Sequence, residues 1–270
     1  MNTNRRVAAV LTGAAAAALV LSGCAGQNAS SSSAAAVQTI EHGKLICAMS
    51  GEYRPFNYYG DDSTLQGFDV DICSAIAEEM GLQPAPVTGA FNTLIAGLQA
   101  NRYDAIVGSM AITDDRKKVV DFSDPYYETG SQLFVPKGSP IASVEDLEGA
   151  TVGVALGTTF EAYARGLSGV SDVKTYQADI DALRDLEAGR LDAVITQSAM
   201  GAYLIKNAGL NIAAAGEMLA PDVAAIPVKK GNIALLDAID SALAAIHDDG
   251  TFAGITTKWF GSEDVFTTTG

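Results

Sequence analysis

Arg116 is the side chain whose type and position best suit the binding of a carboxylate. A guanidinium group is planar and can donate two parallel hydrogen bonds to a carboxylate. Arg116 lies one turn into a predicted helix that follows Ser109-Met110-Ala111-Ile112-Thr113, so its side chain can reach back to the end of the preceding strand. Lys117 and Lys118 follow it, and a solvated basic surface is therefore the simpler alternative.

The segment Leu156-Gly157-Thr158-Thr159-Phe160-Glu161 is a second candidate for anion binding. It follows a predicted strand, Gly157 permits a tight turn, and Thr158 and Glu161 have the spacing of a capping box. Such a turn presents unpaired backbone N–H groups and the positive end of a helix, which suit a carboxylate or another small anion. The lysine and the glycine spacing of a phosphate-binding loop are missing, so a nucleotide is disfavoured. A purely structural cap is the alternative, and we expect Glu161 to be occupied by capping.

Histidine and cysteine chemistry is disfavoured by the number and spacing of these residues. The two histidines, His42 and His247, form no metal or catalytic pattern. Cys47 and Cys73 match no metal or redox spacing, and we expect two separate buried thiols, with a disulfide as the alternative. We therefore predict no cofactor, no metal and no catalytic residue.

Alternating helices and strands must hold these residues in place, which predicts an α/β fold with mainly parallel sheets. The predicted helices cover residues 68–80, 91–101, 159–167, 180–187 and 233–247, and the predicted strands cover 45–49, 105–107, 151–155 and 191–195.

Residues 98–107 and 186–195 share a pattern of helix, tight turn and buried strand. The two segments read Leu-Gln-Ala-Asn-Arg-Tyr-Asp-Ala-Ile-Val and Leu-Glu-Ala-Gly-Arg-Leu-Asp-Ala-Val-Ile. A true repeat predicts two similar lobes, whereas common turn chemistry would produce the likeness by chance. Ligands bind beyond the carboxyl ends of parallel strands, so the residues after the two strands are candidates for a shared cleft. These residues are Gly108, Ser109, Thr196 and Gln197.

Composition sets the broad class of the protein. The chain has 270 residues, and its 17 Lys and Arg against 32 Asp and Glu give a formal net charge of −15. Roughly two compact units are expected at this length. An acidic protein repels phosphate backbones and anionic lipid surfaces, so nucleic acid is excluded as a partner.

The N-terminus indicates export from the cytoplasm. Two arginines precede an uncharged run from Val7 to Leu21, which is typical of a signal peptide. Leu21-Ser22-Gly23-Cys24 resembles a bacterial lipobox. We therefore predict a signal peptide over 1–23, an acyl lipid such as palmitate on Cys24, and a flexible tether over 24–40. A short membrane anchor is the alternative, although the run is shorter than the ~20 residues of a membrane span. Export by either the Sec or the Tat route fits the sequence.

Short motifs in a fixed order extend from about residue 43 to residue 261. They are Tyr53-Arg54-Pro55-Phe56, Leu65-Gln66-Gly67-Phe68-Asp69-Val70-Asp71, Tyr103-Asp104-Ala105-Ile106, Ile112-Thr113-Asp114-Asp115-Arg116, Val120-Asp121-Phe122-Ser123-Asp124-Pro125-Tyr126-Tyr127, Gly153-Val154-Ala155-Leu156-Gly157-Thr158-Thr159, Asp249-Gly250-Thr251 and Lys258-Trp259-Phe260-Gly261. Each motif is weak alone. In this order and spacing, they resemble family 3 of the bacterial extracellular solute-binding proteins, the polar amino-acid receptors of ABC importers.

The resemblance implies a two-lobed periplasmic-binding-protein fold of type II, in which crossing strands near 130–135 and 224–228 join the lobes. The lobes would comprise 41–129 with 227–270 for lobe 1, and 130–226 for lobe 2. Each lobe would be a mainly parallel sheet flanked by helices.

The resemblance also implies a function and its partners. The protein would capture a small polar amino-acid-like ligand and deliver it to ABC permease and ATPase subunits. It would act as a monomer outside the cytoplasm, held at the outer or periplasmic face of the membrane by the Cys24 lipid alone. An enzyme similar to cyclohexadienyl dehydratase is the alternative, because such enzymes share the fold.

Ligand-binding roles follow from the resemblance position by position. Arg116 would clamp the ligand carboxylate together with the backbone N–H groups of Ala111 and Thr159, and Tyr53 and Phe91 would sandwich the ligand side chain. The full predicted set is Glu52, Tyr53, Phe91, Gly108, Ser109, Met110, Ala111, Arg116, Thr158, Thr159 and Gln197.

Three positions depart from the family pattern around the ligand ammonium, which Ser109 would meet. Gln197 stands where the family has an acidic residue, and a neutral amide gives a buried ammonium no counter-charge. Either Glu52 or another carboxylate takes this role, or the ligand carries a substituted amine. Ser50 replaces an aspartate of the receptors for basic amino acids, which argues against arginine or lysine as the ligand. Ala111 replaces a hydroxyl residue.

Overall fold

The computed structural model describes residues 37–266. The signal peptide predicted over 1–23, the lipidation site Cys24 and the first part of the tether predicted over 24–40 lie outside these residues. From Val37 onward the chain forms one compact unit. Within 37–266, no helix combines the length and the apolar character needed to cross a membrane.

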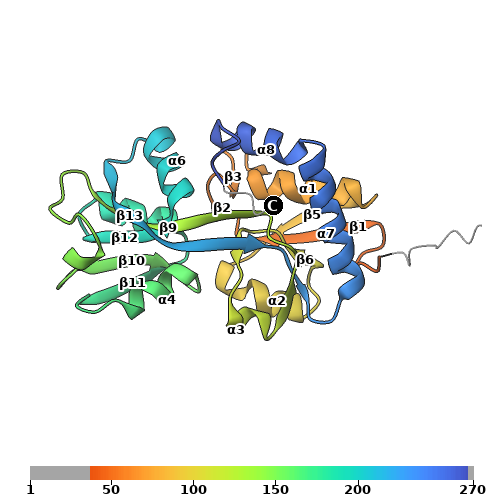
Figure 1. Cartoon of the computed structure of the whole chain (residues 1–270), viewed down its shortest axis with the longest axis horizontal. Coiled ribbons are helices and arrows are strands. Elements are labelled where there is room, and N and C mark those ends of the chain that lie inside the picture. Colours follow the sequence, from red (N-terminus) through yellow and green to blue (C-terminus); the bar gives the residue numbers. More distant parts are fainter. Residues whose placement is uncertain (1–36, 267–270) are drawn as a thin grey trace, which may run out of the picture. The chain divides into compact units, whose positions relative to one another are not determined.

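A five-stranded sheet forms the centre of one lobe (Figure 1). Its strands, in spatial order, are β5 (Gln83–Thr88), β1 (Lys44–Met49), β6 (Ala105–Ile106), β14 (Pro227–Lys229) and β8 (Val120–Phe122). β1 is parallel to β5 and β6, whereas β14 is antiparallel to β6 and β8. This lobe therefore combines segments from both ends of the chain.

Its helices are α1 (Phe68–Glu79), η1 (Phe91–Thr93), α2 (Leu94–Gln99), α3 (Asp114–Lys117), α7 (Ile233–Asp248) and α8 (Thr251–Phe260). A small sheet of β2 (Glu52–Tyr53), β3 (Asn57–Tyr59) and β4 (Leu65–Gln66) lies beside α1.

A six-stranded sheet forms the centre of the other lobe. Its strands, in spatial order, are β11 (Asp172–Tyr176), β10 (Thr151–Ala155), β12 (Ala193–Gln197), β9 (Tyr127–Pro136), β13 (Ile212–Ala225) and β7 (Met110–Ala111). β10 is parallel to β11 and β12, whereas β9 is antiparallel to β12 and β13. The helices of this lobe are η2 (Val144–Asp146), α4 (Thr159–Gly166), α5 (Asp179–Glu187) and α6 (Ser198–Ala208).

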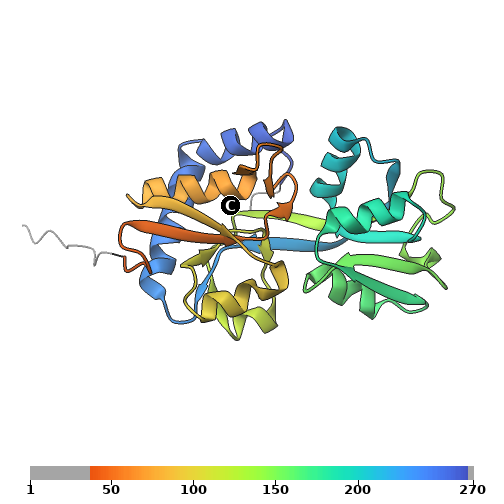
Figure 2. The ribbon, with the colours of Figure 1, turned by 180° about the vertical axis from the view of Figure 1, so that it is seen from behind.

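Two long strands join the lobes. β9 and β13 pair antiparallel over most of their length and pass between the two lobes in both views (Figures 1 and 2). At one end β13 also pairs with β7, which belongs to the first lobe although it joins the six-stranded sheet, because Met110 packs in the core of that lobe. The two-lobed α/β fold with two connecting strands is confirmed, and both sheets are mixed, with parallel strands on one side and antiparallel strands on the other.

Helix α1 shows how the sequence pattern produces this packing. Phe68, Ile72 and Ile76 recur every four residues and are fully buried against the first sheet. Met80 caps the helix, and Gly81 follows it with a φ of 68°, the left-handed conformation common after a helix.

The predicted repeat is present in three dimensions. In the first copy, the N–H groups of Asn101 and Arg102 donate to the carbonyls of Leu98 and Gly97. In the second copy, the N–H groups of Gly189 and Arg190 donate to the carbonyls of Leu186 and Asp185 in the same way. Asn101 and Gly189 both have a positive φ, 55° and 70°. The carboxylate of Asp104 then accepts a 2.8 Å hydrogen bond from the N–H of Ile46 on the neighbouring strand β1. The carboxylate of Asp192 accepts one of the same length from the N–H of Thr151 on the neighbouring strand β10. Helix α1 ends with the same two backbone bonds, from Gly81 and Leu82, so the turn alone is common chemistry. The likeness of the two lobes therefore depends on the matching contacts of Asp104 and Asp192.

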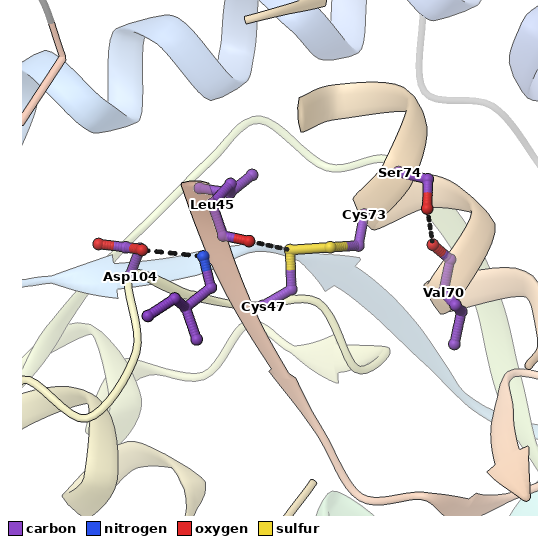
Figure 3. The surroundings of a disulfide bond; sticks show 7 residues. Leu45, Cys47, Val70, Cys73, Ser74 and Asp104 are labelled. Atoms are coloured by element: carbon purple, nitrogen blue, oxygen red, sulfur yellow. Dashed lines mark hydrogen bonds between the residues drawn. A yellow bond between two sulfur atoms is a disulfide. The ribbon is translucent and has the colours of Figure 1, made fainter. Parts of the chain in front are cut away.

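The expectation of two separate thiols was wrong. Cys47 on β1 and Cys73 on α1 form a disulfide, and both are completely buried (Figure 3). The reason is the direct packing of α1 on β1, which brings the two Cα atoms within 6.3 Å. A helix and a strand that are separated in sequence can meet in this way without any recognisable cysteine spacing.

Candidate functional site

A cavity lies between the lobes. One wall comes from β2, η1, the segment 108–111 and α3, and the other comes from the β10–α4 turn and the start of α5. The lining residues are Ser50, Glu52, Tyr53, Phe91, Gly108, Ser109, Ala111, Arg116, Ala155, Thr158, Thr159, Phe160, Gln177, Ala178, Asp179 and Asp222.

Most of the site residues predicted from sequence come together at this cavity, and two do not. Those that line it are Glu52, Tyr53, Phe91, Gly108, Ser109, Ala111, Arg116, Thr158 and Thr159. Met110 is 1% exposed and packs in a hydrophobic core instead. Gln197 is also 1% exposed, and its Nε2 atom donates to the Tyr127 hydroxyl at 3.2 Å. Its Oε1 atom is buried without a hydrogen-bond partner.

Arg116 reaches from one lobe to the other. Thr113 caps its short helix by accepting a hydrogen bond from the Arg116 N–H group. The guanidinium donates to the carbonyl of Ala111 at 2.7 Å in its own lobe and to the carbonyl of Gly157 at 3.0 Å in the other. It also lies 5.6 Å from the centre of the Phe91 ring. Burial lowers the pKa of Arg116, and the nearby carboxylate of Asp222 opposes this effect.

The turn before α4 brings the two lobes into contact. Gly157 has a φ of 79°, and a Cβ atom there would lie 2.8 Å from the Cβ of Asn92 in the other lobe. Thr158 accepts a hydrogen bond from the N–H of Glu161, as a helix cap does, and donates to the carbonyl of Ala155. As predicted, Glu161 is occupied, although its carboxylate binds the N–H of Gly157. The N–H groups of the first turn of α4 therefore lie at the cavity wall.

Replacing Thr158 by alanine should lower the free energy of unfolding by about 1 kcal/mol, because it removes the side-chain cap of α4. Thr158→Ser keeps the hydroxyl group and should restore most of the loss. Urea unfolding of both variants measures the difference. Equal stability of the alanine variant and the original protein would show that this hydroxyl contributes nothing.

Ser109 is held by a buried carboxylate behind the cavity wall. Its hydroxyl donates to Asp69 at 2.9 Å, and Asp69 also accepts hydrogen bonds from Tyr126 and Asn57. The φ of Ser109 is 54°, and its N–H donates to the Tyr126 hydroxyl. Burial raises the pKa of Asp69 to about 6. Because the Ser109 proton points to Asp69, the oxygen is left as an acceptor, which suits a cationic group in the cavity.

Asp179 and Asp222 are two acidic residues that sequence analysis missed. Asp179 is the first residue of α5 and is 6% exposed, and one of its oxygens accepts a hydrogen bond of 2.6 Å from Thr196. Asp222 lies on β13 and accepts a hydrogen bond from the hydroxyl of Thr159. Burial raises the pKa of both, in the case of Asp179 to about 6. The position of Asp179 just beyond β11 is a signal that could have found it, since ligand groups gather at the carboxyl ends of strands.

This arrangement can bind a small molecule that carries both signs of charge. Arg116 offers a planar donor for a carboxylate, the acidic residues offer acceptors for an ammonium, and Tyr53 and Phe91 provide apolar surface. Among residues 37–266, no three histidine, cysteine or acidic side chains come together as ligands for a metal.

Comparison with known proteins identifies the family. The family model of the bacterial extracellular solute-binding proteins, family 3, matches residues 45–262. The chain belongs to this family. It is 35% identical over 226 residues to the L-cystine-binding protein TcyJ of Escherichia coli (strain K12), covering 83% of this chain and 85% of the relative.

Solved structures of similar proteins have the same fold. An ancestral arginine-binding protein bound to arginine has a TM-score of 0.77 and 38% identity, covering 81% of this chain and 99% of its own. An ancestral amino-acid-binding protein, a precursor of cyclohexadienyl dehydratase, has a TM-score of 0.76 and 32% identity, covering 81% of this chain and 96% of its own. Family members are solute-binding proteins, and this last neighbour shows that the fold also occurs in an enzyme lineage.

Proposed function

We propose that this protein is the substrate-binding component of an ABC importer and that it captures an amino acid or amino-acid derivative between its lobes. The observation that carries the proposal is the cavity between the lobes, which combines Arg116 with the acidic side chains of Glu52, Asp179 and Asp222. The relatives support it, because they bind cystine or arginine. Permease and ATPase subunits are the proposed partners.

Arg116 is proposed to hold the ligand carboxylate, helped by the N–H of Thr159 at the start of α4 and by the segment around Ala111. Tyr53 and Phe91 would contact the ligand side chain. The ammonium would face Ser109 and the carboxylates at the cavity, since Gln197 does not line it. A ligand held in this way touches both lobes, so binding stabilises the closed arrangement that a permease recognises.

Export and anchoring are part of the same proposal. Cys24 would carry the lipid, and residues 24–40 would tether the lobes to the outer or periplasmic face of the membrane. We likewise propose that residues 41–129 and 227–270 form lobe 1 and that residues 130–226 form lobe 2. The protein is proposed to bind its ligand without converting it.

A thermal-shift screen tests this function on the unit from Val37 to Gly270. The ligands are the twenty amino acids, their N-substituted derivatives, opines, betaine-like solutes and organic acids. A true ligand raises the melting temperature progressively with its concentration, because it binds the folded state alone. Mass spectrometry of the incubated ligand should recover it unchanged. If no amino acid or derivative shifts the melting temperature, or if a compound is consumed, the receptor function is refuted.

A further inference from the structure

The cavity carries more negative than positive charge. Among the described residues that line it, Arg116 is the one basic side chain, whereas Glu52, Asp179 and Asp222 are acidic. Glu52 is exposed and can be solvated by water. The two aspartates are withdrawn from solvent, so their charges need a partner within the cavity.

Asp179 has no cationic partner among residues 37–266. Its carboxylate accepts a hydrogen bond from the hydroxyl of Thr196, and no ion pair to it occurs within this part of the chain. A buried carboxylate that receives one neutral hydrogen bond is costly, and the raised pKa of Asp179, about 6, reflects that cost. Because Asp179 lines the cavity, a ligand cation can supply the missing charge.

The two aspartates occupy different places relative to Arg116. Arg116 donates to the carbonyl of Gly157, and Asp222 accepts from the hydroxyl of Thr159, two residues further along the same turn. Asp179 instead accepts from the hydroxyl of Thr196 near the end of β12. Arg116 and Asp222 therefore form one charged end of the cavity, and Asp179 lies beyond it on the α5 side.

We infer that the cavity selects an amino acid with a second cationic group, with Asp222 facing the α-ammonium and Asp179 facing the side-chain cation. This inference rests on the proposed function. It also changes the interpretation of Ser50, whose hydroxyl is bonded to Asn57. The acidic group that is missing at Ser50 in one lobe is provided by Asp179 in the other.

The test compares ligands that differ in side-chain charge, by isothermal titration calorimetry at pH 7.5. Arginine and citrulline have nearly the same shape, and lysine, ornithine, glutamine and cystine extend the series. One charge-assisted contact in a buried site corresponds to about tenfold to a hundredfold in affinity, so arginine should bind more tightly than citrulline by that factor. Glutamine, which has no second cationic group, should also bind more weakly than arginine, whereas lysine, ornithine and cystine each carry a second ammonium and should bind more tightly than glutamine.

Asp179→Asn removes the negative charge of this side chain and keeps its hydrogen bond, because an asparagine oxygen can still accept from the Thr196 hydroxyl. This variant should lose the preference for arginine over citrulline, with the affinity for citrulline changed by less than about threefold. Asp181→Asn is the matched control, since Asp181 lies in the same first turn of α5, is exposed and carries the same charge. It should keep the full preference.

The outcomes separate this inference from the function on which it rests. If citrulline or glutamine binds the original protein as tightly as arginine, the charge selectivity is wrong and the receptor function stands. An equal loss of arginine and citrulline in Asp179→Asn would show that Asp179 does not face the side-chain cation. Absence of binding by every amino acid would overturn both the inference and the proposed function.

Discussion

Arg116→Ala should weaken the binding of a carboxylate ligand by about a hundredfold or more, because it removes two charge-assisted hydrogen bonds and leaves a buried carboxylate unpaired. In the unliganded protein, Arg116 donates to the carbonyls of Ala111 and Gly157, which belong to different lobes. A ligand carboxylate can replace one or both of these acceptors. The free energy of unfolding should change by about 1 kcal/mol or less, since the displaced carbonyls lie at a cavity that water can enter.

The carboxylate itself is the control for this prediction. Calorimetry should compare the amino acid found in the screen with its primary amide, which has the same side chain and ammonium. The original protein should prefer the acid strongly, and Arg116→Ala should bind acid and amide with similar weak affinity. Arg190→Ala, which removes an exposed arginine paired with Asp185, should leave both affinities unchanged. If Arg116→Ala weakens the acid and the amide by the same factor, Arg116 does not bind the carboxylate.

Local patterns explain why much of the fold could be predicted from the sequence. The helix, turn and strand of residues 98–107 and 186–195 are set by residues close together in the chain, and they recur with the same backbone hydrogen bonds. Arg116 could be placed near the strand end at Ala111 for the same reason, since a single helical turn separates them. Four residues of the cavity wall could be predicted in the same way, because each comes shortly after the end of a strand: Gly108, Ser109, Thr158 and Thr159.

The elements missed are those whose surroundings come from distant parts of the chain. β11 reads Asp-Val-Lys-Thr-Tyr and has little apolar character, because it is an edge strand with exposed side chains. Without that strand, Asp179 at its far end had no predicted position. Asp222 lies within a 14-residue strand rich in alanine, and its contact with Thr159 exists only because β13 crosses between the lobes.

Gln197 illustrates the limit of carrying over a role by position. Its strand, β12, continues to Gln197 itself, two residues beyond the predicted end. The Gln197 side chain turns to the Tyr127 hydroxyl and does not line the cavity. The adjacent Thr196 instead holds Asp179 at the cavity, so the acidic group near this strand end comes from a different element. Sequence position defines the end of the strand, whereas the choice of side chain that faces the ligand depends on packing.

Asp179→Asn should stabilise the unliganded protein at pH 7 while it weakens ligand selection. The pKa of Asp179 is raised from an unfolded value of about 3.9 to about 6, so the folded state binds more protons than the unfolded state between these values. Stability from this group is therefore full at low pH and is lost as the pH rises through about 6. A shift of roughly two pKa units corresponds to about 3 kcal/mol, and we expect the variant to recover about 1 to 3 kcal/mol at pH 7.

At pH 4.5 the same substitution should have little effect, because Asp179 is then protonated in the folded protein and already neutral. Urea unfolding of the original protein, Asp179→Asn and Asp181→Asn at both pH values measures this. The proteins must be compared with one another at each pH, because the pKa values of Asp69 and Asp222 are also raised and these groups change the stability of all three proteins between the two pH values. A variant that is no more stable than the original protein at pH 7 would contradict the argument. Stabilisation at pH 7 that disappears at pH 4.5 would mean that the unliganded cavity keeps a destabilising charge at Asp179.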